Sequence, residues 1–134
     1  MGNEQTAPSD VVIIILSLLG EGNKIPADNK FLYNKFFELS QDSDFYLLFQ
    51  DFIFNASATY PYCEAVEIAV SRITKFGLVE WKTLESDYTI LPTLVSRGKR
   101  LMQLFSAGDR IKLGKASEKF KAMTKEHYKN SREG

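Results

Sequence analysis

The chain has 134 residues, of which 44% are hydrophobic and 25% charged, with 17 Lys and Arg against 17 Asp and Glu. A chain of this length forms one globular domain whose core needs no metal, and its single cysteine, Cys63, excludes an internal disulfide and fits a reducing compartment. The net charge of zero conceals a division, because residues 1–94 carry 6 Lys and Arg against 13 Asp and Glu, whereas residues 95–134 carry 11 against 4.

The N-terminal part predicts a disordered leader, residues 1–8, followed by an apolar helix that Ser9 or Asp10 caps and that ends near Leu19. The run "VVIIILSLLG" is shorter than the roughly 20 residues that a membrane span needs. Acidic residues precede it where a signal peptide has basic ones. Because it is apolar on nearly all faces, we expect a helix in the middle of the core of a cytoplasmic protein.

Two segments follow before the middle of the chain. The spacing of Leu32, Phe36 and Leu39 predicts a second helix over residues 28–40, capped by Asp28 or Asn29. The aromatic run "FYLLFQDFIF" has helical spacing at its start and strand-like composition at its end. We predict a helix from about Asp44, with "DFIF" as its last turn or as a short strand.

The next pattern predicts a third helix, residues 61–77, and a β-hairpin directly after it. Its buried stripe is expected to comprise Tyr62, Val66, Ala69, Val70, Ile73 and Phe76. Gly77 can take the positive φ that ends a helix. Two β-prone runs, 78–82 and 87–91, then alternate around a polar turn, and the ring of Trp81 is expected to lie buried beneath the hairpin.

Two further helical patterns end the chain. One follows Pro92 and passes through Leu94, Leu101, Leu104 and Phe105, with Gly98 as a weak point. The other, after Gly108 and Gly114, is rich in lysine. Its narrow apolar edge consists of Phe120 and Met123 with His127 or Tyr128.

The order of these elements and two phrases resemble the winged-helix superfamily, in particular small prokaryotic regulators. The phrases are "ITKFGLVEW" and "YTILPTLVSRGKRL", which resemble an L-x-x-x-G-L-V helix end and a Y-x-L-T-x-x-G-x-x-L segment. "TYPYC" is similar to the Y-G-P-Y-S phrase of Panacea-type antitoxins at Pro61 and Tyr62 only. The expected fold is mainly α with a small antiparallel β-hairpin: a winged helix-turn-helix core, residues 9–106, plus a basic C-terminal helix or tail, residues 107–134.

No motif in the chain points to an enzyme. The one histidine, His127, stands in the lysine-rich helix, and Cys63 reads as a small buried residue. Asp42 and Asp44 are explained by capping of the following helix. Without a phosphate loop, CxxC or HExxH motif, we expect no catalytic residue, no metal and no cofactor.

The resemblance implies a regulator that binds double-stranded DNA, with the third helix in the major groove. Arg72 and Lys75 would then lie nearest the bases, and the C-terminal cations would contact phosphates. The candidate DNA-binding residues are Arg72, Lys75, Lys82, Arg97, Lys99, Arg100, Arg110, Lys112, Lys115 and Lys119, with Lys121, Lys125, Lys129 and Arg132 as further phosphate contacts.

The acidic residues of the same region favour an alternative. Glu64 and Glu67 occupy the half of the third helix that typically approaches bases, and Glu85 and Asp87 flank the hairpin turn. Such a face suits a protein-binding adaptor or antitoxin-like module that binds no nucleic acid. The basic C-terminal helix itself has three interpretations: a solvated helix, an arm that contacts phosphates, or an arm that crosses the acidic body of a second copy in a homodimer.

Overall fold

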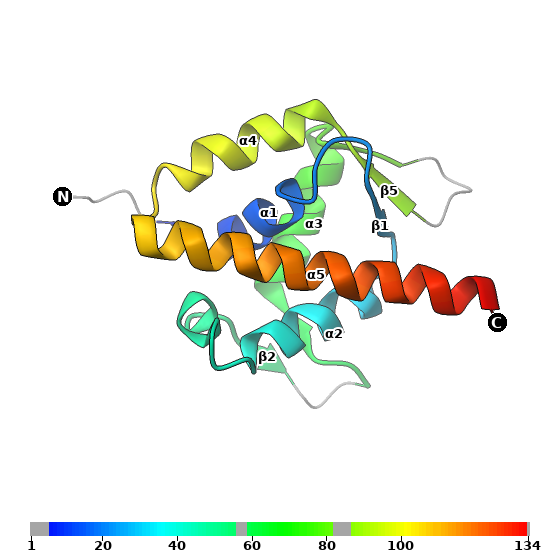
Figure 1. Ribbon diagram of the computed structural model, residues 1–134, viewed down its shortest axis with the longest axis horizontal. Coiled ribbons are helices and arrows are strands. Elements are labelled where there is room, and N and C mark those ends of the chain that lie inside the picture. Colours follow the sequence, from blue (N-terminus) through cyan, green and yellow to red (C-terminus); the bar gives the residue numbers. More distant parts are fainter. Residues whose placement is uncertain (1–5, 56–58, 82–86, 134) are drawn as a thin grey trace.

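The computed structural model describes residues 6–55, 59–81 and 87–133, and shows a mainly helical fold with a small antiparallel sheet (Figure 1). The α-helices in these ranges are α1 (Pro8–Ser17), α2 (Asn29–Ser40), α3 (Glu64–Lys75), α4 (Pro92–Met102) and α5 (Ala107–Glu133), and η1 (Tyr46–Phe49) is a 3-10 turn. The strands are β1 (Lys24–Pro26), β2 (Phe54–Asn55), β3 (Tyr62–Cys63), β4 (Val79–Glu80) and β5 (Asp87–Ile90). Most of the leader expected over residues 1–8 lies outside the described residues.

Helix α1 is the centre of the core, as its apolar sequence predicts. Every side chain from Val11 to Leu16 is at most 5% exposed, and the helix packs against α3, α4 and α5. The predicted cap at Ser9 or Asp10 is wrong, because the cap is Ala7 and the helix begins at Pro8, whose missing N–H leaves no donor unsatisfied. The Asp10 carboxylate instead accepts from the Ala7 N–H, at 2.9 Å. Among the described residues, no helix is long and apolar enough to cross a membrane.

The predicted second helix is confirmed as α2. Asp28 caps it, since its carboxylate accepts from the backbone N–H of Lys30 at 2.9 Å and of Phe31 at 3.4 Å. Leu32, Phe36 and Leu39 are buried. A short capping side chain and a clean apolar stripe are local signals, so this element could be found without knowledge of the fold.

The predicted hairpin exists, but it belongs to a three-stranded sheet of order β1–β5–β4. β4 and β5 pair antiparallel with Val79 opposite Ile90, and β1 pairs with the other edge of β5. Gly77, with φ +67, provides the predicted reversal between α3 and β4. Lys82 and the predicted turn fall on residues 82–86, outside the described residues.

The aromatic run 45–54 does not form the predicted α-helix. It makes the single 3-10 turn η1 and then the short strand β2, which was the alternative for its end. β2 pairs with β3, so α3 begins at Glu64 and not near Pro61. The Phe49 ring packs against Phe36 of α2 and against Phe52, with centroids 6.4 and 4.8 Å apart, so part of the packing of this run comes from another element.

Two aromatic side chains predicted to be buried are exposed. Phe76 is 65% exposed because α3 ends at Lys75, so Phe76 leaves the helical backbone and the buried stripe of the helix. Trp81 is 50% exposed because it follows the two-residue strand β4, and its ring meets Tyr88 edge-on with centroids 5.7 Å apart.

The lysine-rich C-terminal segment is one continuous helix, α5, that lies across the front of the molecule in Figure 1. Leu113, Ala116 and Phe120 are fully buried against the rest of the chain. The Ser117 hydroxyl donates to the Ile15 carbonyl at 2.9 Å. The predicted apolar edge therefore packs on the core of its own chain, and α5 is part of that core.

Candidate functional site

The predicted DNA-binding residues do not form one surface. They are divided among α3, α4 and α5, and Lys82 lies outside the described residues. In Figure 1, α5 crosses in front of α1 while α3 lies behind it, and α1 packs against both. A duplex lying on α3 would therefore not be reached by the exposed side of α5.

Four of the cations do come together, around the exposed ring of Phe76. A depression of about 630 Å³ is lined by Arg72 and Lys75 of α3, and one of about 330 Å³ by Arg97 and Arg100 of α4. Phe76 lines both. We name these four cations with Phe76 the α3–α4 patch.

Two hydrogen bonds at the base of the hairpin position this patch. The Thr93 hydroxyl donates to the Gly77 carbonyl at 2.9 Å, and the Leu91 N–H donates to the Leu78 carbonyl at 3.2 Å. They fix the first turn of α4 against the chain reversal that ends α3. The cations of two helices are therefore held side by side.

Most of the charge of the α3–α4 patch is uncompensated. Arg72 lies 3.8 Å from the Asp10 carboxylate and donates to the Ser9 hydroxyl at 3.4 Å. Lys75, Arg97 and Arg100 have no ion pair or side-chain hydrogen bond within the described residues. With respect to the described part of the chain, these three cations are available to an anionic partner.

The N-terminal half of α3 has the opposite character. Glu67 accepts a 2.7 Å hydrogen bond from the Tyr62 hydroxyl, which raises the pKa of Tyr62 to about 12. Burial, together with the nearby Glu67 charge, raises the pKa of Tyr33 to about 12 as well. Glu64 is exposed beside them, and Ile68 is 38% exposed. This half is acidic, as the sequence indicated, and the exposed Ile68 adds an apolar side chain that was not predicted.

Two of the predicted residues on α5 have partners within the chain. The Arg110 guanidinium donates to the carbonyls of Met102 and Phe105, at 3.1 and 3.0 Å, and so closes the end of α4. Lys119 pairs with Asp42, and its hydrogen bond lowers the pKa of that carboxyl. Lys115 on α5 and Lys99 on α4 are exposed, and Lys112 is half-buried.

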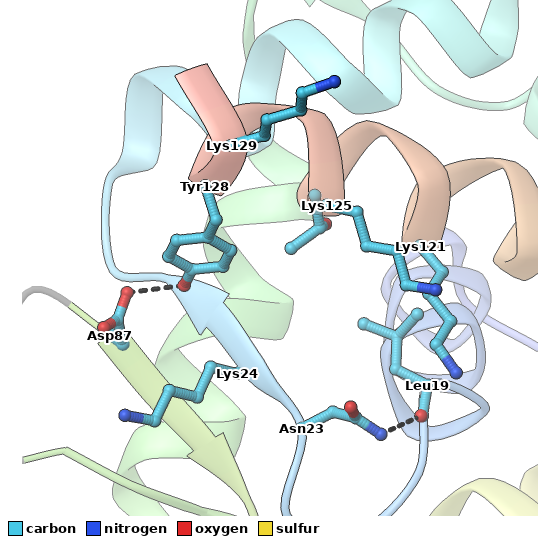
Figure 2. A pocket seen from close by; sticks show the side chains of 9 residues that line it. Leu19, Asn23, Lys24, Asp87, Lys121, Lys125, Tyr128 and Lys129 are labelled. Carbon is cyan, nitrogen blue, oxygen red and sulfur yellow. Dashed lines mark hydrogen bonds between the residues drawn. The ribbon is translucent and has the colours of Figure 1, made fainter. Parts of the chain in front are cut away.

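A second cationic site was not predicted as such, although its lysines from α5, Lys121, Lys125 and Lys129, were among the predicted phosphate contacts. A cavity of about 710 Å³ lies between the C-terminal half of α5 and strands β1 and β5 (Figure 2). We name it the lysine pocket; its lining residues are Leu19, Asn23, Lys24, Asp87, Lys121, Thr124, Lys125, Tyr128 and Lys129. The four-residue spacing of the three α5 lysines was a usable signal, but Lys24 joins them only because β1 pairs with β5.

The residues with catalytic or metal-binding side chains are used in packing. The His127 ring lies against Phe31, with centroids 4.7 Å apart, and Cys63 is buried where α3 begins. In the described part of the chain, no three His, Cys, Asp or Glu side chains come together in a metal-binding group.

Comparison with protein-family models, with curated proteins and with solved structures gives no match to this chain.

Proposed function

We propose that the chain is a winged-helix regulatory protein that binds double-stranded DNA through the α3–α4 patch. The observation that carries the proposal is the grouping of Lys75, Arg97 and Arg100, which have no ion pair within the described residues, around an exposed aromatic ring next to the hairpin. The fold supports it through the order α1–β1–α2–η1–β2–β3–α3–β4–β5, in which the strand after the first helix joins the sheet of the hairpin and the short pair β2–β3 stands between α2 and α3.

The contacts expected from this patch are to phosphates. Guanidinium and ammonium groups that neutralise phosphates release counterions, which makes the affinity fall steeply with salt. The base-reading role fits only the C-terminal half of α3, because Glu64 and Glu67 would bring carboxylates close to the phosphates. The proposed complex thus depends on charge more than on base readout, and it places α5 away from the duplex.

The experiment is a fluorescence anisotropy titration of a labelled random duplex, at about 50 and about 200 mM salt. We expect micromolar binding that weakens with salt. Arg97→Ala combined with Arg100→Ala should reduce the slope of log affinity against log salt by about 2, since each phosphate contact contributes about 0.9.

The matched control is Lys112→Ala with Lys115→Ala, which removes the same charge from α5. This variant should bind like the unaltered chain. Equal losses in both variants would mean that α5 carries the binding, and no binding by the unaltered chain at micromolar concentration would overturn the proposal.

A second candidate function, binding of protein without nucleic acid, is favoured by the apolar and acidic side chains that line the larger depression beside α3. Ile68 and Phe76, 38% and 65% exposed, line the same depression beside Glu67. Exposed apolar side chains grouped in a concave surface are typical of a protein interface. The partner proposed is a second copy, whose α3–α4 patch would complement the glutamates of the first. Sedimentation velocity should then show a dimer that Ile68→Asp converts to monomer, and a monomeric unaltered chain would exclude it.

A further inference from the structure

The lysine pocket carries an excess of positive charge, with four lysines against one carboxylate among the described residues that line it. Lys121, Lys125 and Lys129 stand on successive turns of α5, and Lys24 comes from β1 on the other side. None of the four makes an ion pair within the described residues. Among the described residues, Asp87 is the one carboxylate that lines the pocket, and it accepts a hydrogen bond from the Tyr128 hydroxyl.

Figure 2 shows how these side chains are arranged. Lys121 and Lys125 extend over one wall, on the side of Asn23, whose amide is held by the Leu19 carbonyl at 2.6 Å. Tyr128 and Lys24 form the opposite wall, beside Asp87, and the ammonium group of Lys24 points away from those of Lys121 and Lys125. Lys129 stands at the rim, and its ammonium group points away from the others. The lysine stems are flexible, so their ammonium groups can converge on a ligand placed between the walls.

The walls also contain groups suited to the rest of a ligand. Leu19 and the ring of Tyr128 provide apolar surface, and burial together with the Asp87 hydrogen bond raises the pKa of the Tyr128 hydroxyl, which keeps that hydroxyl neutral. Asp87 offers an acceptor for a hydroxyl group. The volume of about 710 Å³ lies within the range of small-molecule sites.

We propose that the lysine pocket binds a small organic phosphate that carries two or more negative charges. Lys121 and Lys125 hold the phosphate groups from α5, Lys24 holds them from the sheet, and Asp87 and Tyr128 face the remainder of the molecule. The ligand then bridges the C-terminal half of α5 and strands β1 and β5. The pocket shares no lining residue with the α3–α4 patch, so this inference is independent of the proposed DNA binding.

The experiment is isothermal titration calorimetry with ATP and with inorganic tripolyphosphate, at about 50 mM salt. We expect saturable 1:1 binding with a Kd of about 100 μM or lower for at least one of the two. Lys121→Gln with Lys125→Gln should weaken this binding at least about tenfold, because it removes two direct charge partners. Lys112→Gln with Lys115→Gln is the matched control on the same helix and should change it less than about twofold.

Amide chemical shifts locate the bound phosphate. Saturation should shift the signals of Asn23, Lys24 and Thr124 and leave those around Phe76 unchanged. Absence of saturable binding at about 1 mM of both compounds, or equal weakening in the control variant, would overturn the proposal. So would duplex DNA that shifts the same pocket signals and displaces the phosphate, because the lysines would then belong to a nucleic-acid surface.

Discussion

At the scale of single residues, Gly98 shows how a local weakness in the sequence can be a requirement of packing. A glycine in a helix interior is unfavourable by itself, and the pattern marked it as a weak point of α4. In the structure α4 crosses α1 at this residue. A Cβ at Gly98 would lie 1.8 Å from the Ser17 hydroxyl oxygen and 2.4 Å from the Ser17 Cβ. Ser17 cannot move aside easily, since it is buried and donates to the Ile14 carbonyl at 2.7 Å.

Gly98→Ala should therefore destabilise the protein, although alanine is the better helix former. We expect a loss of about 1–3 kcal/mol in the free energy of unfolding from overpacking. Gly114→Ala in α5 is the matched control, because no atom of the described residues lies within 4 Å of its added Cβ, and it should gain about 0.5–1 kcal/mol in the free energy of unfolding. Urea unfolding measures both. An increase in stability on Gly98→Ala would show that α1 and α4 are further apart than described.

At the scale of elements, the charge pattern of α5 did not indicate that this helix is part of the core. Its lysines suggested an appendage, yet its inner face inserts Phe120 between Phe31 and Phe36, with ring centroids 6.2 and 5.1 Å apart. Phe120→Ala should cost about 3–5 kcal/mol in the free energy of unfolding, because the ring is fully buried. Denaturant unfolding of the Phe120→Ala variant, compared with that of an Ile111→Ala control variant, measures this loss of stability.

Ile111 lies on the same helix and is 61% exposed, so its substitution should change stability by less than about 0.5 kcal/mol. Similar small effects at both positions would mean that α5 is not part of the core. The same reasoning applies to a chain that ends at Ser106. Such a chain would leave the rings of Phe31 and Phe36 uncovered, so we expect it to fold poorly.

The elements that the sequence predicted are those with local signals. α1 has a continuous apolar run, α2 has the Asp28 cap, and the end of α3 has a glycine whose φ is positive. β1 has only three residues, too few for a visible alternation, and it exists because β5 supplies its hydrogen bonds from the other half of the chain. The buried face of α5 includes Ala116 and Ser117. Small residues of this kind do not stand out in a hydrophobic pattern, so the pattern did not predict that this face is buried.

At the scale of the whole molecule, the sequence shows that basic residues are concentrated in the C-terminal part of the chain, but not on which surfaces of the fold they lie. Arg97 and Arg100 lie in the α3–α4 patch, and Lys119 pairs with Asp42. Lys121 and Lys125 line the lysine pocket. Which face a helix presents depends on its packing, and the partner helix or strand is distant in the sequence. For this reason the cations could be assigned to the α3–α4 patch and to the lysine pocket only after the fold was known.

The division of charge also predicts how the whole molecule responds to the loss of one lysine. If the acidic body neutralised the basic helix, removing Lys125 would destabilise the protein. In the structure Lys125 makes no ion pair within the described residues and has Lys121 and Lys129 four residues away on either side. Like charges at this spacing repel by about 0.2–0.5 kcal/mol per pair.

Lys125→Gln should therefore raise the free energy of unfolding by about 0.4–1 kcal/mol at low salt, and the gain should shrink at about 1 M salt because the repulsion is screened. Lys99→Gln is the matched control, since no charged residue stands four positions from Lys99 on either side, and it should leave stability nearly unchanged. Denaturant unfolding of the three chains at both salt concentrations measures the difference. A destabilised Lys125→Gln would mean that the acidic body holds this lysine, and the pocket would then lack the uncompensated charge that a phosphate is expected to meet.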